Sequence, residues 1–122
     1  MTTWTIRRAL PLACLLALPL AGCVSAGGDS AGRASALATT ISRANACKAG
    51  APQRTTLDRF LATEQARGAT PEQLAAARSA YIGVSEAEMV NQGVKPQRCT
   101  AEEREALKRR MAAIRAGTFD ER

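Results

Sequence analysis

The chain has 122 residues and a formal net charge of +6, with 17 lysines and arginines against 11 aspartates and glutamates. This length allows a single domain. Histidine is missing from the whole sequence, which removes the usual general base and the commonest neutral metal ligand. Composition and charge therefore exclude most enzyme classes and most metal sites, and we expect no catalytic activity and no bound cofactor.

The first residues have the composition of a secretory signal peptide. Arg7 and Arg8 close a positively charged segment, and residues 9–20 are apolar apart from Pro11 and Pro19. A membrane-spanning helix needs about 20 apolar residues and tolerates proline poorly, whereas this stretch has only 12 residues. The pattern predicts a removed targeting segment rather than a transmembrane helix.

A specific motif follows at Leu20-Ala21-Gly22-Cys23. It resembles the lipobox of bacterial lipoprotein signal peptides, which has a leucine, two small residues and a cysteine. The resemblance implies removal of residues 1–22, a diacylglycerol on the Cys23 thiol and, in many bacteria, a further acyl chain such as palmitate. Two or three acyl chains anchor a protein stably in a membrane. The implied place is the cell envelope, facing the periplasm, and Val24 in place of aspartate favours the outer membrane over the inner one.

Two cysteines remain once Cys14 is removed and Cys23 is lipidated. In an exported chain, Cys47 and Cys99 are predicted to form a disulfide. Such a bond closes a loop of about 50 residues, and the chain-entropy model assigns it roughly 4 kcal/mol. A metal or redox pair is the alternative, but the sequence contains neither a CxxC motif nor a histidine.

The mature chain is predicted to begin with a lipidated, flexible linker and to continue as one small helical domain. Residues 23–33 are rich in glycine, serine and alanine, which is typical of a flexible tether. The domain is assigned to residues 34–122. Its first helix is predicted over residues 34–47, with Leu37 and Ile41 at helical spacing, and Gly50 and Pro52 are expected to stop it.

The second helix is predicted to begin at Thr55 or Thr56 and to end at Gly68, which suits the left-handed position after a helix. Phe60 and Glu64 share one face of this helix. The aromatic residues of the mature chain are predicted to belong to the core, with a ligand groove as the alternative; they are Phe60, Tyr81 and Phe119.

The third helix opens with Thr70 and Gln73, which are spaced as a capping box, and with a proline at the first helical position. Gly83 interrupts the apolar stripe that follows, and Ser85 and Glu88 have the spacing of a second capping box. These residues predict a helix that is kinked or split near Gly83.

The fourth helix has the clearest signals. Thr100 is predicted as its N-cap, Glu103 as the partner in a capping box, and Gly117 as its end. Glu105 and Arg109 are spaced as an i,i+4 ion pair. Its apolar seam consists of Leu107, Met111 and Ile114.

No segment shows the alternation of apolar and polar residues that strands require. The connections between the helical segments are short, which favours antiparallel neighbours. The predicted fold is therefore all-α: a small antiparallel bundle of about four helices, stapled by the Cys47–Cys99 disulfide.

One group of charged residues is a candidate binding surface. Arg104, Lys108 and Arg115 fall within about 40° of one another on a helical wheel, at about 100° per residue. We expect this basic edge to contact an anionic partner, either lipid headgroups or an envelope polysaccharide. The alternative is a solvated face that keeps the domain soluble. Nucleic acid is not an expected partner, because an exported chain does not meet it and aromatic stacking platforms are few.

These features predict a membrane-anchored, non-catalytic helical module that acts through protein or envelope contacts. A periplasmic stress or chaperone-like protein is the alternative. In plan, as a small helical domain with one long-range disulfide, the mature chain is similar to the acid-stress periplasmic chaperones. No motif of theirs is matched, so that resemblance assigns no residue. The sequence leaves the oligomeric state open.

Overall fold

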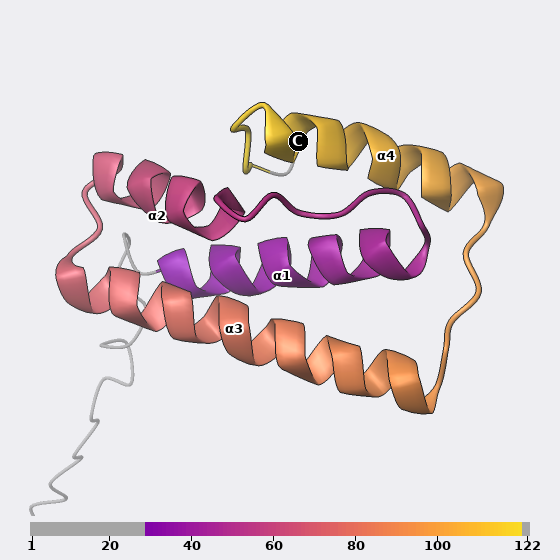
Figure 1. Cartoon of the computed structure of the whole chain (residues 1–122). Helices are drawn as coiled ribbons and strands as arrows, with labels where there is room; N and C mark the ends of the chain where they lie inside the picture. Colours follow the sequence, from indigo (N-terminus) through magenta and orange to yellow (C-terminus); the bar gives the residue numbers. More distant parts are fainter. Residues whose placement is uncertain (1–28, 121–122) are drawn as a thin grey trace, which may run out of the picture.

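The computed structural model describes residues 29–120, which form four α-helices and no strand (Figure 1). The helices are α1 (Ser30–Ala46), α2 (Thr56–Ala66), α3 (Pro71–Val94) and α4 (Ala101–Arg115). Consecutive helices run in opposite directions, and a disulfide joins Cys47 to Cys99. The predicted all-α bundle is confirmed. Within the described range, no helix combines the length and the apolar character needed to cross a membrane.

The central element of the bundle is α1. It packs most extensively against α3, which runs parallel to it, and α4 lies on its opposite side (Figure 1). The connector formed by residues 47–55 runs back between α1 and α4. Because α1 is covered on two sides, several of its buried residues are alanine, which lets neighbouring helices approach closely; they include Ala34, Ala38 and Ala44.

The core is small. Its buried apolar residues are Ala34, Leu37, Ala38, Ile41, Ala44, Cys47, Ala49, Phe60, Leu61, Ala77, Met111 and Ile114. Phe119 packs edge-on against Phe60, with ring centroids 5.6 Å apart, and Tyr81 packs against the core from α3. Phe60 is therefore a core residue, as predicted, whereas Tyr81 and Phe119 are partly buried at the edge of the core.

The boundary predicted between the tether and the domain is wrong. The sequence predicts residues 30–33 as part of the flexible linker, but they form the first turn of α1. Ser30 is buried, and both Ser30 and Arg33 bind the carboxylate of Glu64 on α2. Contacts with a distant helix thus order a segment whose glycine and serine content favours a coil. The predicted lipid-attachment residue, Cys23, and the signal peptide lie outside the described residues.

The predicted split of the third helix near Gly83 is also wrong, because α3 is continuous from Pro71 to Val94. The capping box of Thr70 and Gln73 is formed, but the second box, at Ser85, is not used. A glycine inside a helix costs about 1 kcal/mol relative to alanine. Packing along the length of α1 outweighs this cost, since tertiary contacts supply most of the stability of a helix in a protein.

Two side chains on α4 have partners other than the predicted ones. Thr100 caps the helix by accepting a hydrogen bond from the Glu103 amide, but the Glu103 carboxylate binds Arg43 instead of completing the box. Glu105 pairs with Lys108 at 2.8 Å rather than with Arg109. A stronger partner on another helix therefore replaces the local contact of Glu103.

Candidate functional site

The predicted basic edge lies on α4, where Arg104, Lys108 and Arg115 are all exposed. Arg104 Nε donates to the carbonyl of Cys47 at 2.9 Å, and Arg115 Nη2 donates to the carbonyl of Ala51 at 3.1 Å. Lys108 Nζ pairs with Glu105. The two arginines thus hold the connector against α4, so each has a structural contact in addition to its charge.

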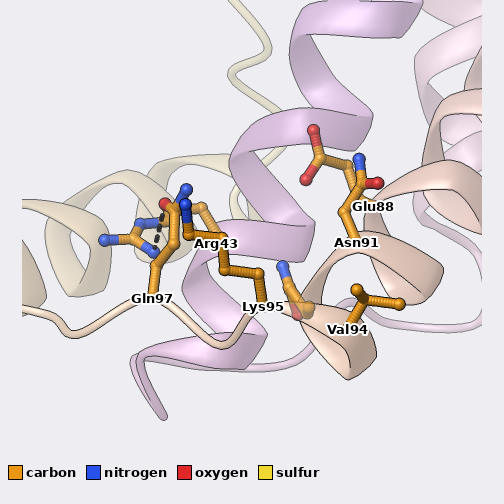
Figure 2. Close-up of a pocket in the computed structure, with 7 residues that line it drawn as sticks. Arg43, Glu88, Asn91, Val94, Lys95 and Gln97 are labelled. Carbon is orange, nitrogen blue, oxygen red and sulfur yellow. Dashed lines mark hydrogen bonds between the residues drawn. The ribbon is translucent and has the colours of Figure 1, made fainter.

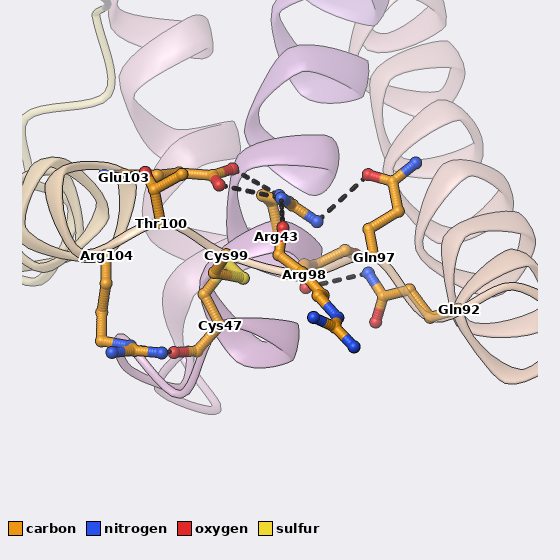
Figure 3. Close-up of a disulfide and its surroundings, with 10 residues drawn as sticks. Arg43, Cys47, Gln92, Gln97, Arg98, Cys99, Thr100, Glu103 and Arg104 are labelled. Carbon is orange, nitrogen blue, oxygen red and sulfur yellow. Dashed lines mark hydrogen bonds and ion pairs between the residues drawn. A yellow bond between two sulfur atoms is a disulfide. The ribbon is translucent and has the colours of Figure 1, made fainter.

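The disulfide joins the end of α1 to the start of α4 (Figure 3). Its Cα atoms are 5.6 Å apart. Beside it, Arg43 donates to the two carboxylate oxygens of Glu103 at 2.6 and 2.9 Å, and to the Gln97 side chain at 3.1 Å. A bidentate pair of this kind has defined geometry. The junction is therefore fastened twice, by a covalent bond and by an ion pair.

Among residues 29–120, this junction is also where three possible metal ligands lie close together. The Sγ atoms of Cys47 and Cys99 and a carboxylate oxygen of Glu103 lie within 4.8 Å of one another. Metals bind thiolates, whereas these sulfur atoms are bonded to each other. The carboxylate is already paired with a guanidinium. In this oxidised form the cluster does not fit a metal.

A buried acidic cluster is the main feature that the sequence did not predict. The side chain of Glu64 is only 1% exposed. It accepts a hydrogen bond from Ser30 Oγ at 2.6 Å and is bound by the guanidinium of Arg33, with Nε 3.0 Å from Oε1. Arg67 approaches the same carboxylate at 3.5 Å and also binds Asp120. This cluster ties α1, α2 and the C-terminal segment together.

One feature of the sequence points to this cluster: Glu64 lies on the apolar face of α2. Buried carboxylates are nearly always paired, so a glutamate on a core face predicts a cation nearby. Its partners could not be found from the sequence, because Ser30 and Arg33 are 34 and 31 residues away along the chain.

The pKa of Glu64 determines how this cluster responds to acid. Burial raises the pKa of Glu64. Hydrogen bonds from Arg33 and Ser30 and the charges of Arg33 and Arg67 lower it by more than burial raises it, so the pKa lies below the ordinary 4.5. A carboxyl whose pKa is lower in the folded chain stabilises the fold fully above its unfolded pKa. This contribution is lost as pH falls through the folded pKa.

We therefore expect the difference in unfolding free energy between the wild type and Glu64→Gln to be constant from neutral pH to about pH 5 and to shrink below it. Urea unfolding of both proteins across this range measures the difference. A difference that grows as pH falls would contradict the assigned charge state.

An open hollow lies between the C-terminal ends of α1 and α3, and Figure 2 shows the residues that line it. Its volume is about 370 Å³. Small-molecule sites combine mostly apolar walls with a few convergent polar groups. All the residues that line this hollow except Val94 are polar or charged, and the Arg43 guanidinium beside it is already bonded to Glu103 and Gln97. The lining residues are Arg43, Glu88, Asn91, Gln92, Val94, Lys95 and Gln97. This hollow does not have the character of a ligand site.

From its middle to its C-terminus, α3 carries an exposed apolar edge. Its members are Ile82, Met89, Val90 and Val94, with 44%, 68%, 61% and 81% of their surface exposed. They lie on the helix that covers one side of α1, away from α4 (Figure 1). Glu86 is also exposed and falls between Ile82 and Val90 on the helical wheel. The edge is therefore apolar with one acidic group inside it.

Comparison of the chain with protein-family models, with curated proteins and with solved structures finds no match. Its function therefore has to be inferred from its own residues.

Proposed function

We propose that the chain is the precursor of a lipid-anchored protein of the bacterial cell envelope. Its helical module faces the periplasm and acts through contacts with envelope proteins or surfaces, without catalysis. The observation that carries the proposal is the Leu20-Ala21-Gly22-Cys23 motif directly after a short apolar segment. Cleavage before Cys23 leaves that residue as the lipidated N-terminus.

Two features of the domain support this assignment. The disulfide between Cys47 and Cys99 is of the kind that persists in oxidising compartments outside the cytosol. The helical domain starts soon after the proposed anchor, because α1 begins at Ser30. At about 3.5 Å per residue, the chain from Cys23 to Asp29 spans at most about 21 Å. The module is thus kept close to the bilayer surface.

The intact mass of protein extracted from membranes tests the proposal. We expect a chain that starts at Cys23, is heavier by two or three acyl groups, and is alkylated at Cys47 and Cys99 only after reduction. A full-length, unlipidated mass with free thiols would contradict both the lipid anchor and the export of the chain.

A second candidate, a periplasmic stress or chaperone-like protein, is favoured by the exposed apolar edge of α3. Such a protein presents apolar surface to unfolded clients. An acid titration followed with an apolar dye separates the two candidates. An increase in dye binding on mild acidification favours the chaperone, whereas unchanged binding down to about pH 3 counts against it.

A further inference from the structure

We infer that a basic strip on the α4 side of the molecule faces the anionic headgroups of the bilayer that holds the lipid anchor. The strip consists of Lys48, Arg54, Arg104, Lys108 and Arg115. This inference rests on the proposed lipid anchor and deepens it, because it names the surface of the module that meets the membrane.

The strip is assembled from two segments that are distant in the sequence. Hydrogen bonds from Arg104 to the Cys47 carbonyl and from Arg115 to the Ala51 carbonyl dock the connector along α4. Lys48 directly follows Cys47, and Arg54 comes three residues after Ala51. The connector therefore carries two further cations and is docked along the helix that carries the other three.

The charges of the strip remain available to a partner. Lys48 and Arg54 are exposed, and their side chains form no ion pair or hydrogen bond among the residues that the structure describes. Arg104 uses only its Nε–H in the contact with Cys47, although a guanidinium has five N–H donors. The pair between Lys108 and Glu105 is half-exposed, and such surface pairs are weak and screened by salt.

The anchor places this strip within reach of the bilayer. The first turn of α1 lies near α4 and the segment that follows it, because Gly32 and Arg33 line one hollow with Arg110 and Phe119. The helix residues of the strip extend over about 17 Å of α4, from Arg115 to Arg104, at 1.5 Å per residue. A tether of at most about 21 Å gives the membrane surface a high effective concentration. This proximity favours the bilayer over a more distant polysaccharide.

The apolar edge of α3 is the competing surface, and it fits the membrane less well. Glu86 lies within that edge, so docking it on the bilayer would press a carboxylate toward anionic headgroups. The helix that carries most of the basic strip, α4, lies on the other side of α1 from α3 (Figure 1), and the charge of the strip is complementary to anionic headgroups.

Three lysines of the mature chain, Lys48, Lys95 and Lys108, make a footprinting experiment possible. Two belong to the strip, and Lys95 follows the apolar edge of α3 as an internal control. The lipidated protein is placed in neutral phosphatidylcholine vesicles and in vesicles that also contain phosphatidylglycerol. Acetylation of each lysine is then followed by mass spectrometry. We expect Lys48 and Lys108 to react about threefold or more slowly on anionic vesicles, with Lys95 unchanged and the protection lost at high salt.

Two matched variants test the charge itself. Arg54→Glu changes the strip, whereas Arg109→Glu makes the same change at an exposed residue beside Ala113 and Thr118, on another side of α4. The side chains of Arg54 and Arg109 form no hydrogen bond or ion pair among the described residues. Both substitutions should therefore leave the fold intact. Arg54→Glu is expected to lose most of the protection of Lys48, and Arg109→Glu is expected to keep it.

Equal acetylation rates on both kinds of vesicle would overturn the inference. Protection of Lys95 instead of Lys48 and Lys108 would also overturn it and would turn the α3 side toward the bilayer. Protection that needs an added acidic polysaccharide, and not anionic lipid, would assign the strip to a different partner. The intact mass of the same sample reports separately on the anchor, so a failed footprint on lipidated protein refutes the inference alone.

Discussion

Replacing both Cys47 and Cys99 with alanine is expected to lower the free energy of unfolding by about 4 kcal/mol. The two residues are 52 positions apart, and a bond across a loop of this length removes much conformational entropy from the unfolded chain. The Arg43–Glu103 pair at the same junction is partly exposed, so it would compensate for only a small part of this loss. Urea unfolding followed by circular dichroism measures the loss.

Reductant provides the control for this prediction. It should destabilise the wild type by a similar amount and leave the double variant unchanged, because the variant has no Cys47–Cys99 bond to reduce. An unfolding curve of the wild type that does not move after verified reduction would show that the domain does not depend on this bond.

Replacing Glu64 with glutamine is expected to lower the free energy of unfolding by about 2–4 kcal/mol. The glutamine keeps the shape of the side chain but removes the charge that Arg33 and Arg67 face, and an unpaired charge at a buried site is strongly destabilising. The loss of unfolding free energy should be less than about 4 kcal/mol, the upper end of this range, because Arg33 is 37% exposed and water can solvate its charge.

The matched control is Glu86→Gln, which makes the same chemical change at an exposed position on α3. A surface substitution of this kind should change the unfolding free energy by no more than about 0.5 kcal/mol. Equal losses in the two variants would mean that net charge, and not the buried cluster, is responsible. Hydrogen exchange of the first turn of α1 should also rise in Glu64→Gln alone, because Ser30 and Arg33 are held by that carboxylate.

Local signals predicted most of the helices. Thr70 and Thr100 act as N-caps, as predicted. Gly68 and Gly117 have the positive φ values of 96° and 91° that a residue after a helix requires. Capping is readable because its partners lie within about four residues of one another.

The same local rules failed where a distant partner or extended packing opposed them. Glu103 has the spacing of a capping box but pairs with Arg43, which is 60 residues away. Gly83 carries a local helix-breaking signal, yet α3 continues through it along α1. Residues 30–33 have the composition of a linker, yet the Glu64 cluster makes them helical. In each case the tertiary contact is worth more than the local preference.

The sequence by itself determined the helical class of the domain, its number of helices and the pairing of Cys47 with Cys99, because periodicity, caps and cysteine number are properties of neighbouring residues or of a simple count. Only the tertiary structure decided that α1 is central, that Glu64 is buried against Ser30 and Arg33, and that the connector after Cys47 docks along the basic edge of α4. These features depend on which distant segments meet. Which distant segments pack together depends on the burial and pairing of side chains over the whole chain, and a local sequence pattern does not contain this information.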